Sequence, residues 1–201
     1  MAGLKLIAGL GNPGVEYLQT RHNVGFWFVD ALAQAAGAEF RPDKKLDGLT
    51  CSISVGPGPV RLFKPTTFMN HSGRALAAVT SYYRIEPDQC LIVHDDLDLA
   101  PGDIRLKFDG GHGGQNGLRD IIKALGSSGF QRLRIGIGHP GHKDHVTPWV
   151  LGRPSATDEE AILDGMARAR DVLPLAVEGD LNEAMKRLHT GRDSGLGTRD
   201  S

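Results

Sequence analysis

The middle of the chain contains the short apolar run Cys90-Leu91-Ile92-Val93-His94. Strands of this composition are typical of a sheet that is covered on both faces. The apolar run Leu4–Leu10 predicts a second buried strand, and Asp103–Lys107 and Arg132–Gly138 are expected to form two more. Several strands of this kind indicate a fold with one sheet at its centre.

Segments with helical spacing lie between these strands. Asn23–Ala36 is expected to be a helix with Asn23 as its N-cap and Gly37 ending it. His71–Tyr83 is expected to be another, with Ser72 as its N-cap. Further helices are expected at Leu118–Leu125, Thr157–Val172 and Asn182–Leu188, and a hairpin at Thr50–Val55 and Val60–Phe63. The alternation predicts an α/β fold: a single-domain three-layer α/β/α arrangement with a mixed, largely parallel central sheet.

The composition indicates an ordinary globular protein. The chain of 201 residues has 40% hydrophobic and 23% charged residues. We expect one domain over residues 1–189 and a disordered tail over 190–201, which is rich in Gly, Ser, Asp and Arg. Because no apolar run reaches about 18 residues and the start lacks a signal-peptide layout, no membrane association is expected. Cys51 and Cys90 lie far apart, as is typical of reduced thiols in a cytoplasmic protein.

Charge is unevenly distributed, although the formal net charge is only −1. Residues 105–145 contain seven Lys or Arg against three acidic residues, whereas residues 151–189 contain five against eight. A basic segment can mark a surface for nucleic acid, and chance asymmetry of a solvated surface is the alternative.

The loop after the first strand, Gly9-Leu10-Gly11-Asn12-Pro13-Gly14, fits the pattern of a dinucleotide-binding turn. A helix should begin directly after such a turn, yet the next helical spacing starts only near Asn23. The acidic residue that would bind the ribose is also missing, because Asp30 falls within the expected helix and Glu39 lies beyond it. A nicotinamide or flavin site is therefore disfavoured.

His22 and Asp95 are candidates for catalysis. His22 follows the first strand and Asp95 ends the strand at Cys90–His94, and ligands of open α/β sheets gather at the carboxyl ends of strands. A carboxylate there would hold an imidazole in the correct tautomer and stabilise its protonated form. Asp96 and Asp98 would also suit Mg²⁺ or Ca²⁺, but the EF-hand spacing is absent, and turn acids or helix caps are the alternative.

Two other catalytic classes are disfavoured. A zinc site of His139, His142, Asp144 and His145 is not expected, because Pro140 places these residues in a loop rather than on a zinc-binding helix. A serine hydrolase of the G-x-S-x-G type is not expected, because that motif is absent from the sequence.

The segment Pro65-Thr66-Thr67-Phe68-Met69-Asn70 is too polar for an ordinary strand. One interpretation is a loop with Phe68 and Met69 packed down onto the core. The other is the wall of a binding site, with Asn70 supplying amide hydrogen bonds.

A second glycine-rich loop, Gly110–Gly117, has five glycines among eight residues. So many glycines carry an entropic cost, which close approach of the backbone to a substrate would explain. Asn116 would either cap the helix that follows or face a ligand.

Five blocks of the sequence, in order, resemble the signatures of bacterial-type peptidyl-tRNA hydrolases. The blocks are Gly9-Leu10-Gly11-Asn12-Pro13-Gly14 with Tyr17 and Thr20-Arg21-His22-Asn23, then Pro65-Thr66-Thr67-Phe68-Met69-Asn70, Val93-His94-Asp95-Asp96-Leu97-Asp98, Gly110-Gly111-His112-Gly113-Gly114, and Arg132-Leu133-Arg134-Ile135-Gly136-Ile137-Gly138-His139-Pro140. The resemblance extends from about Leu4 to His189, nearly the whole chain.

The resemblance implies hydrolysis of the ester that joins a peptide or an N-blocked amino acid to the terminal ribose of tRNA, with no cofactor and no metal. It implies that His22 is the general base, that Asp95 orients and polarises it, and that Asn12 discriminates blocked from free aminoacyl-tRNA. The implied substrate contacts are Tyr17, Phe68, Met69, Asn70 and Asn116, and the implied contacts with tRNA phosphates are Arg105, Lys107 and Arg134. The implied partner is tRNA, and the family is usually monomeric.

Gln115 departs from the family pattern, in which this position is often His. A glutamine donates and accepts hydrogen bonds but does not titrate. An auxiliary protonatable role at this position is therefore in doubt, whereas the role of His22 is not.

Two hypotheses for function follow: an esterase acting on peptidyl-tRNA, and a non-catalytic tRNA-binding module. The joint presence of five residues favours the esterase: His22, Asp95, Asn12, Asn70 and Asn116.

The segment Thr157–Leu188 follows the catalytic blocks and is a candidate for a lid over the cleft.

Overall fold

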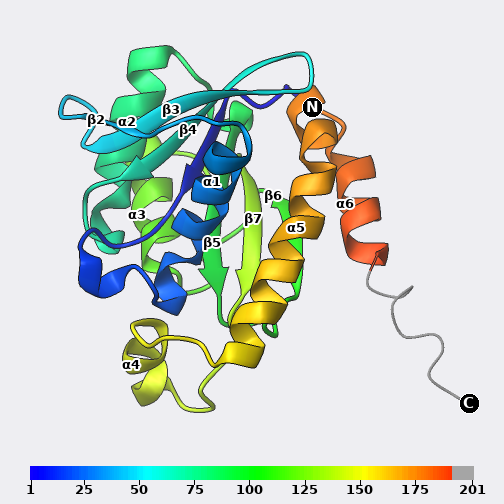
Figure 1. Ribbon diagram of the computed structural model, residues 1–201. Helices are drawn as coiled ribbons and strands as arrows, with labels where there is room; N and C mark the ends of the chain where they lie inside the picture. The colour runs from blue at the N-terminus through cyan, green and yellow to red at the C-terminus, as the bar shows by residue number, and fades with distance from the viewer. Residues whose placement is uncertain (192–201) are drawn as a thin grey trace, which may run out of the picture.

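The computed structural model describes residues 1–191, and Figure 1 shows a central sheet with helices on both faces. The strands are β1 (Leu6–Gly9), β2 (Arg41–Asp43), β3 (Gly48–Val55), β4 (Gly58–Pro65), β5 (Cys90–Asp96), β6 (Ile104–Phe108) and β7 (Gln131–Gly136). The helices are α1 (Val24–Ala35), α2 (Ser72–Tyr83), α3 (Asn116–Leu125), α4 (Val146–Val150), α5 (Ala156–Glu178) and α6 (Leu181–Thr190), with short 3-10 turns η2 (Arg21–Asn23) and η3 (Met69–His71) used below. The tail expected over 190–201 lies outside the described residues from 192 onward, and Thr190 still belongs to α6.

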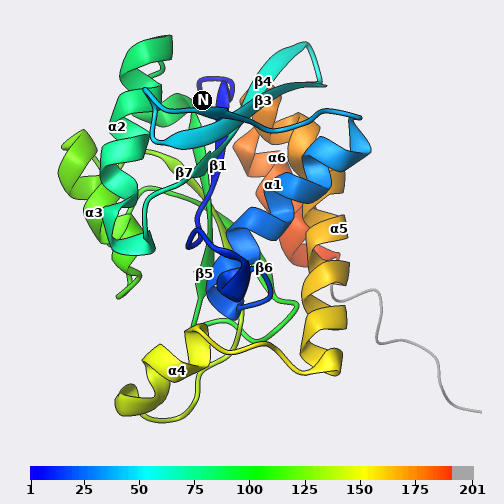
Figure 2. The ribbon, with the colours of Figure 1, turned by 60° about the vertical axis from the view of Figure 1, so that its left-hand side comes forward.

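Seven strands form one mixed sheet in the order β2-β3-β4-β1-β5-β7-β6. β4, β1, β5 and β7 are parallel neighbours, whereas β2, β3 and β6 join the sheet antiparallel. One apolar core lies between the sheet and α1, α5 and α6, and the other lies between the sheet and α2 and α3 (Figures 1 and 2). The predicted three-layer α/β/α fold is confirmed. In the part of the chain that is described, no helix has the length and apolar character needed to cross a membrane.

The sequence patterns did not predict the short elements β2 and α4, and they placed the end of α5 too early. β2 has three residues and α4 has five, and the prolines Pro42 and Pro148 within them argue against regular structure. α5 extends past the expected end at Val172 and runs through Pro174. Because α5 and α6 contribute buried side chains to the core, they are a layer of the domain, and the hypothesis of a lid at Thr157–Leu188 is wrong.

Neither expected N-cap residue caps its helix. Ser72 is the first residue of α2, and its hydroxyl donates to the Met69 carbonyl oxygen at 2.7 Å, while His71 takes the N-cap position. Asn23 does precede α1, but its side chain makes no capping hydrogen bond. That side chain binds the loop after β1 instead, as described below.

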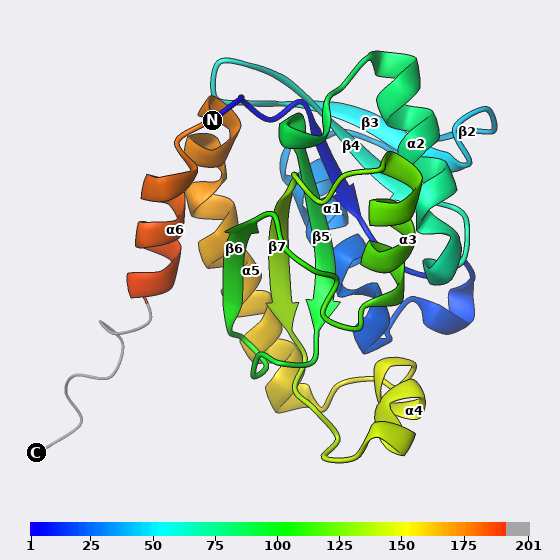
Figure 3. The ribbon, with the colours of Figure 1, turned by 180° about the vertical axis from the view of Figure 1, so that it is seen from behind.

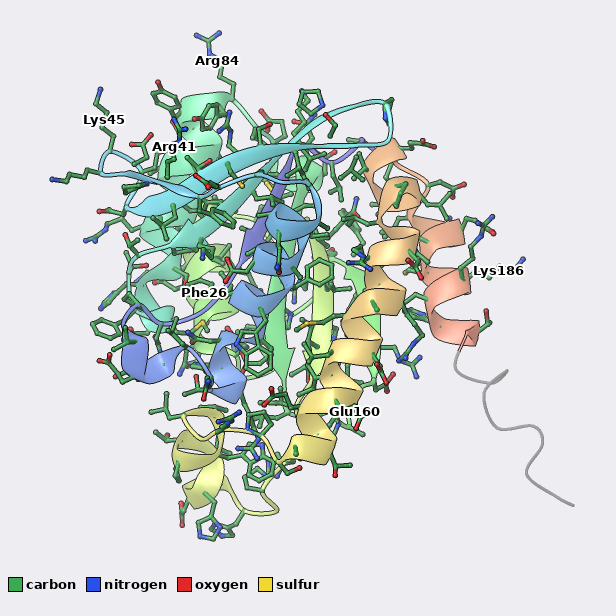
Figure 4. The ribbon with its side chains drawn as sticks, viewed as in Figure 1. Phe26, Arg41, Lys45, Arg84, Glu160 and Lys186 are labelled. Carbon is green, nitrogen blue, oxygen red and sulfur yellow. The ribbon has the colours of Figure 1, made fainter. Side chains whose placement is uncertain are left out.

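α1 crosses β1 at close range through Gly9 and Gly25. A Cβ atom on Gly9 would lie 2.2 Å from the Gly25 carbonyl oxygen, and one on Gly25 would lie 2.5 Å from the Val93 carbonyl oxygen. Gly11 is closed off in the same way, because a Cβ atom there would lie 2.7 Å from the ring of Phe26, which is labelled in Figure 4. These close contacts hold η2, immediately before α1, against the carboxyl ends of β1 and β5.

Both edges of the sheet are protected. β6 lies alongside α6 (Figure 3), and the Leu106 N–H donates to Nε2 of His189 at 3.1 Å. Burial and the nearby Arg105 charge lower the pKa of His189, which favours the neutral ring, and the Leu106 N–H selects the tautomer in which Nε2 accepts. At the other edge, β2 is short, includes Pro42, which has no N–H, and carries the charged Arg41, which extends into solvent in Figure 4.

Candidate active site

A cavity opens at the carboxyl ends of the central strands. Its lining includes His22 of η2, Asp95 of β5, Gln115 and Asn116 at the start of α3, and Val146, Thr147 and Val150 of α4. Segments that are far apart in the sequence therefore meet at one edge of the sheet, where open α/β sheets bind ligands.

The centre of the cavity is a hydrogen-bonded pair. Nδ1 of His22 lies 2.7 Å from Oδ2 of Asp95, and the two side chains are only 13% and 3% exposed. With Asp95 ionised, Nδ1 carries the proton and donates it, which leaves Nε2 as the nitrogen that can accept a proton. Burial alone would lower the pKa of His22, but the Asp95 charge and hydrogen bond together outweigh burial and raise it above 6.5.

Asn12 is held in place from two sides. Its backbone N–H donates to Oδ1 of Asn23 at 2.9 Å, and its carbonyl oxygen accepts from Nδ2 of Asn23 at 3.0 Å. Its side-chain Oδ1 accepts from the Met69 N–H at 2.7 Å. Nδ2 of Asn12 has no hydrogen-bond partner among residues 1–191 and remains available as a donor.

Gln115 links Asp95 to the rest of the site. Its Nε2 donates to Oδ1 of Asp95 at 3.0 Å and lies 3.2 Å from Sδ of Met69. Its Oε1 accepts from the Leu118 N–H at 2.8 Å, so Gln115 is the N-cap of α3. In the sequence this residue stood out only as a departure from a family pattern, and its contacts were missed.

These hydrogen bonds, together with the peptide link between two neighbours in η2, close a ring. The ring runs through His22, Asp95, Gln115, Met69, Asn12 and Asn23. Five separate segments of the chain contribute to it, and no member is oriented by its own segment alone. The arrangement fixes an imidazole, a carboxylate and three side-chain amides in a partly buried setting, which suits acid–base chemistry.

The loop before α2 is divided between the core and the surface. Met69 is buried, but Phe68 is 53% exposed, so the interpretation with both side chains packed down is wrong for Phe68. Tyr17 meets Phe68 edge to face, with ring centroids 6.3 Å apart. Asn70 is exposed in η3 and is not among the residues that line the cavity with His22.

Asn116 is the first residue of α3 and is exposed at the mouth of the cavity. It does not cap the helix, because Gln115 does so. The capping role expected for Asn116 is therefore wrong, and a role in facing a ligand stays a prediction.

One wall of the cavity is α4, which is attached to η2 through Arg21. The Arg21 guanidinium lies 3.6 Å from the centroid of the Trp149 ring and donates through Nη1 to the Trp149 carbonyl oxygen at 3.0 Å. The Arg21 N–H also donates to the Gly152 carbonyl oxygen at 3.0 Å. The residue next to His22 therefore positions the apolar wall that faces His22.

Four basic side chains share one face of the β6–β7 pair. Arg105 pairs with Arg134, and Lys107 pairs with Arg132, while the alternate residues of both strands face the core. Like charges directly opposite one another destabilise a sheet, so a compensating partner is expected above all for Arg132, which is only 2% exposed. Arg132 was not among the predicted site residues, because its position depends on strand register.

Ion pairs and backbone contacts organise these cations. Nε of Arg134 donates to Oδ2 of Asp96 at 2.8 Å, and Nε of Arg105 lies 3.3 Å from Oδ1 of Asp103. Arg132 donates from both Nη atoms to the carbonyl oxygens of Gly110 and Gly111 in the glycine-rich loop. A second cavity, lined in part by Lys107, Arg132 and Arg134, adjoins the first and shares His94, Asp96, His112 and Gly113 with it.

Within the described part of the chain, no group of three or more His, Cys, Asp or Glu side chains is arranged to hold a metal ion. Cys51 and Cys90 are both free thiols. Burial and neighbouring acidic groups raise the pKa of Cys90 to about 12, so this thiol is not a nucleophile at neutral pH.

Comparisons with known proteins agree with one another. The sequence model of the family described as peptidyl-tRNA hydrolase matches residues 6–195. A peptidyl-tRNA hydrolase of Stenotrophomonas maltophilia (strain R551-3) is 61% identical over 190 residues, which cover 94% of this chain and 99% of the relative. One from Xanthomonas euvesicatoria is 60% identical, with 94% and 98% covered. The crystal structure of peptidyl-tRNA hydrolase from Acinetobacter baumannii matches with a TM-score of 0.91 at 45% identity, covering 94% of this chain and 95% of that one.

Proposed function

The chain belongs to the peptidyl-tRNA hydrolase family and is an enzyme of that family, and we propose that it cleaves its substrate by general-base activation of water at His22. The bond cleaved is the ester that joins a peptide or an N-blocked amino acid to the terminal ribose of tRNA. The observation that carries the proposal is the 2.7 Å hydrogen bond between Nδ1 of His22 and Oδ2 of Asp95. That contact selects the tautomer in which Nε2 is unprotonated.

The proposed reaction has two proton transfers. Nε2 of His22 takes a proton from water as the water oxygen attacks the ester carbonyl carbon, and Asp95 stabilises the imidazolium that forms. The tetrahedral intermediate then expels the ribose oxygen, which receives the proton from Nε2. The products are a peptide with a free carboxyl group and a tRNA with a free ribose hydroxyl.

Asn12 and Asn116 are proposed to contact the acyl group. Asn12 is a buried member of the ring with its Nδ2 available as a donor, so it can stabilise a carbonyl or the oxyanion, a contribution of about 3 kcal/mol per donor. A donor fixed at this position also suits recognition of a blocked α-amino group. We keep Tyr17, Phe68 and Asn70 as proposed outer contacts, since exposed aromatic rings can stack on bases of a single strand.

Phosphates of tRNA are proposed to bind the basic face of β6 and β7. Arg105, Lys107 and Arg134 point to the same side there, and Arg132 lies between them and the glycine-rich loop. Contacts of this kind set affinity without reading sequence, which suits an enzyme that accepts many tRNAs.

The whole proposal includes a catalytic domain over residues 1–189, acting as a monomer in the cytoplasm. The non-catalytic tRNA-binding alternative and the nicotinamide alternative both lose support, because the chain belongs to a family of hydrolases. Sedimentation of the purified protein at micromolar concentration would reveal any dimer.

The pH dependence of the wild-type enzyme tests the mechanism. With N-acetyl-aminoacyl-tRNA as substrate, we expect kcat to rise with pH through the pKa of His22, which is raised above 6.5, and then to level off. The sign follows because the base must be neutral to accept a proton. Free aminoacyl-tRNA is the control and is expected to remain uncleaved. A kcat that does not change between about pH 5 and 8 would exclude His22 as the base.

A salt titration tests the phosphate surface. Lys107→Ala is expected to weaken tRNA binding and to reduce the slope of log affinity against log salt by about 0.7 to 1, because one phosphate contact is lost. The kcat at saturating substrate should stay close to that of the wild type. Lys45→Ala removes an exposed lysine far from the cavity, at the β2 edge in Figure 4, and should leave the slope unchanged. Equal slopes for the two variants would place the tRNA elsewhere.

A further inference from the structure

The carboxamide of Gln115 has a single possible orientation. Its Oε1 is committed to the Leu118 N–H at 2.8 Å, and its Nε2 lies within 3.0 Å of Oδ1 of Asp95 and 3.2 Å of Sδ of Met69. Rotating the amide by 180° would place Oε1 against the carboxylate oxygen and the NH₂ group against a backbone N–H. The cap of α3 therefore forces the donor end of Gln115 toward Asp95.

Asp95 in turn is held at both oxygens. Oδ2 bonds Nδ1 of His22 and Oδ1 accepts from Gln115, so rotation of the carboxylate away from His22 would break the second bond. Among residues 1–191, Asp95 is the one side chain that hydrogen-bonds the His22 imidazole. Whatever fixes the plane of the Asp95 carboxylate therefore fixes the imidazole as well.

We infer that Gln115 is a positioning residue for the reaction, which acts on His22 through Asp95 and uses the N-cap of α3 as its own support. This inference rests on the proposed function. The donor is a neutral amide, so the contact does not switch off over the pH range in which His22 titrates. The same residue joins the glycine-rich loop to the catalytic pair, because Gln115 directly follows Gly113 and Gly114 in the cavity lining.

Gln115→Asn separates the positioning role from the capping role. Asparagine is a preferred N-cap, so α3 should keep its cap, but the side chain is one methylene shorter and no longer reaches Asp95. We expect kcat for N-acetyl-aminoacyl-tRNA to fall about 10- to 100-fold, with KM and the melting temperature close to wild type. A variant with wild-type kcat would show that Gln115 is only a cap and would overturn the inference.

Gln115→Glu supplies a readout that a purely structural role would not move. Glutamate keeps the length and the acceptor for Leu118, but it places a second negative charge beside Asp95. That charge favours the imidazolium of His22, so the acidic limb of the kcat profile should move to higher pH. The other titratable side chains that line the cavity, His94, Asp96 and His112, are the same in both proteins and do not contribute to the difference.

The outcomes separate this inference from the proposed function. If the wild-type enzyme shows no acidic limb, the general-base mechanism fails before the variants are considered. If the wild type shows the limb and both variants retain its kcat and its profile, only the role of Gln115 is overturned. Circular dichroism melting and tRNA binding of each variant identify a loss of folding, in which case the other variant decides.

Discussion

His22→Ala is expected to lower kcat for N-acetyl-aminoacyl-tRNA by about 10²- to 10⁴-fold while tRNA binding persists. The expectation follows from the ring of hydrogen bonds at the cavity, in which His22 is the one imidazole and our proposed base, and in which Asp95 is already committed to Nδ1. Lys107 and Arg134, which we propose to bind phosphates, line the adjoining cavity, and His22 is not among the residues that line it, so affinity for tRNA should change little. Single-turnover hydrolysis and filter binding, measured on the same preparation, give the two quantities.

His142→Ala is the matched control. This histidine is 59% exposed and lines neither cavity, so its removal should leave kcat and binding unchanged. If His22→Ala retained more than about a tenth of wild-type kcat, the water would have to be activated by another group. Addition of imidazole offers a further check, because it is expected to restore part of the lost rate in His22→Ala alone.

Asp95→Asn is expected to lower kcat by about 10²- to 10⁴-fold even though it replaces a single atom of the side chain's carboxylate. Gln115 explains the size of the effect. Its Nε2 requires an acceptor, so the carbonyl oxygen of the substituted amide would face Gln115 and the NH₂ group would face His22. Nδ1 of His22 would then accept a hydrogen bond, and the proton would move to Nε2, where it blocks the base.

The same substitution has a predicted effect on pH dependence. The Asp95 charge is what raises the pKa of His22 against the opposite effect of burial. Without that charge the pKa falls, so any residual activity should have its acidic limb at lower pH than in the wild type. The tautomer can be followed by ¹⁵N chemical shifts of His22, with Asp98→Asn as a control for the loss of a nearby charge. An unchanged tautomer with full activity would contradict this explanation.

The fold was predictable because its central strands appear in the sequence as short runs of apolar residues. β5 and β1 are apolar runs, and the helices between them have clear spacing, so the layers and the mixed sheet follow from that pattern. β2 and α4 were not predictable. β2 has three residues and α4 has five, and each includes a proline, so neither is long enough to show a periodic pattern of apolar residues. Their structure depends on contacts with neighbouring segments of the chain.

The site was predictable only in part, because most of its contacts join segments that are far apart in the sequence. Placing His22 and Asp95 together needs only adjacent parallel strands, and the structure brings them to 2.7 Å. Asn23 is a residue type that often caps helices. Its side chain instead bonds the backbone of Asn12, and it makes no capping hydrogen bond to α1. No sequence pattern around Gln115 indicates its contact with Asp95, which lies 20 positions earlier in the chain. Such contacts depend on where the chain folds back, which single-sequence patterns do not encode.

The covered edges of the sheet have a consequence for the substrate itself. The acyl part of the substrate is a chain with unpaired backbone groups, and an open strand edge captures such chains by adding them to the sheet, whatever their sequence. Here the Leu106 N–H is already taken by His189, and β2 offers only three residues, one of them proline. Along the described part of the sheet, these two edges therefore offer little room for the peptide of the substrate to add as a further strand. The cavity at the carboxyl ends of the central strands then remains the place where the peptide and its ester are proposed to bind.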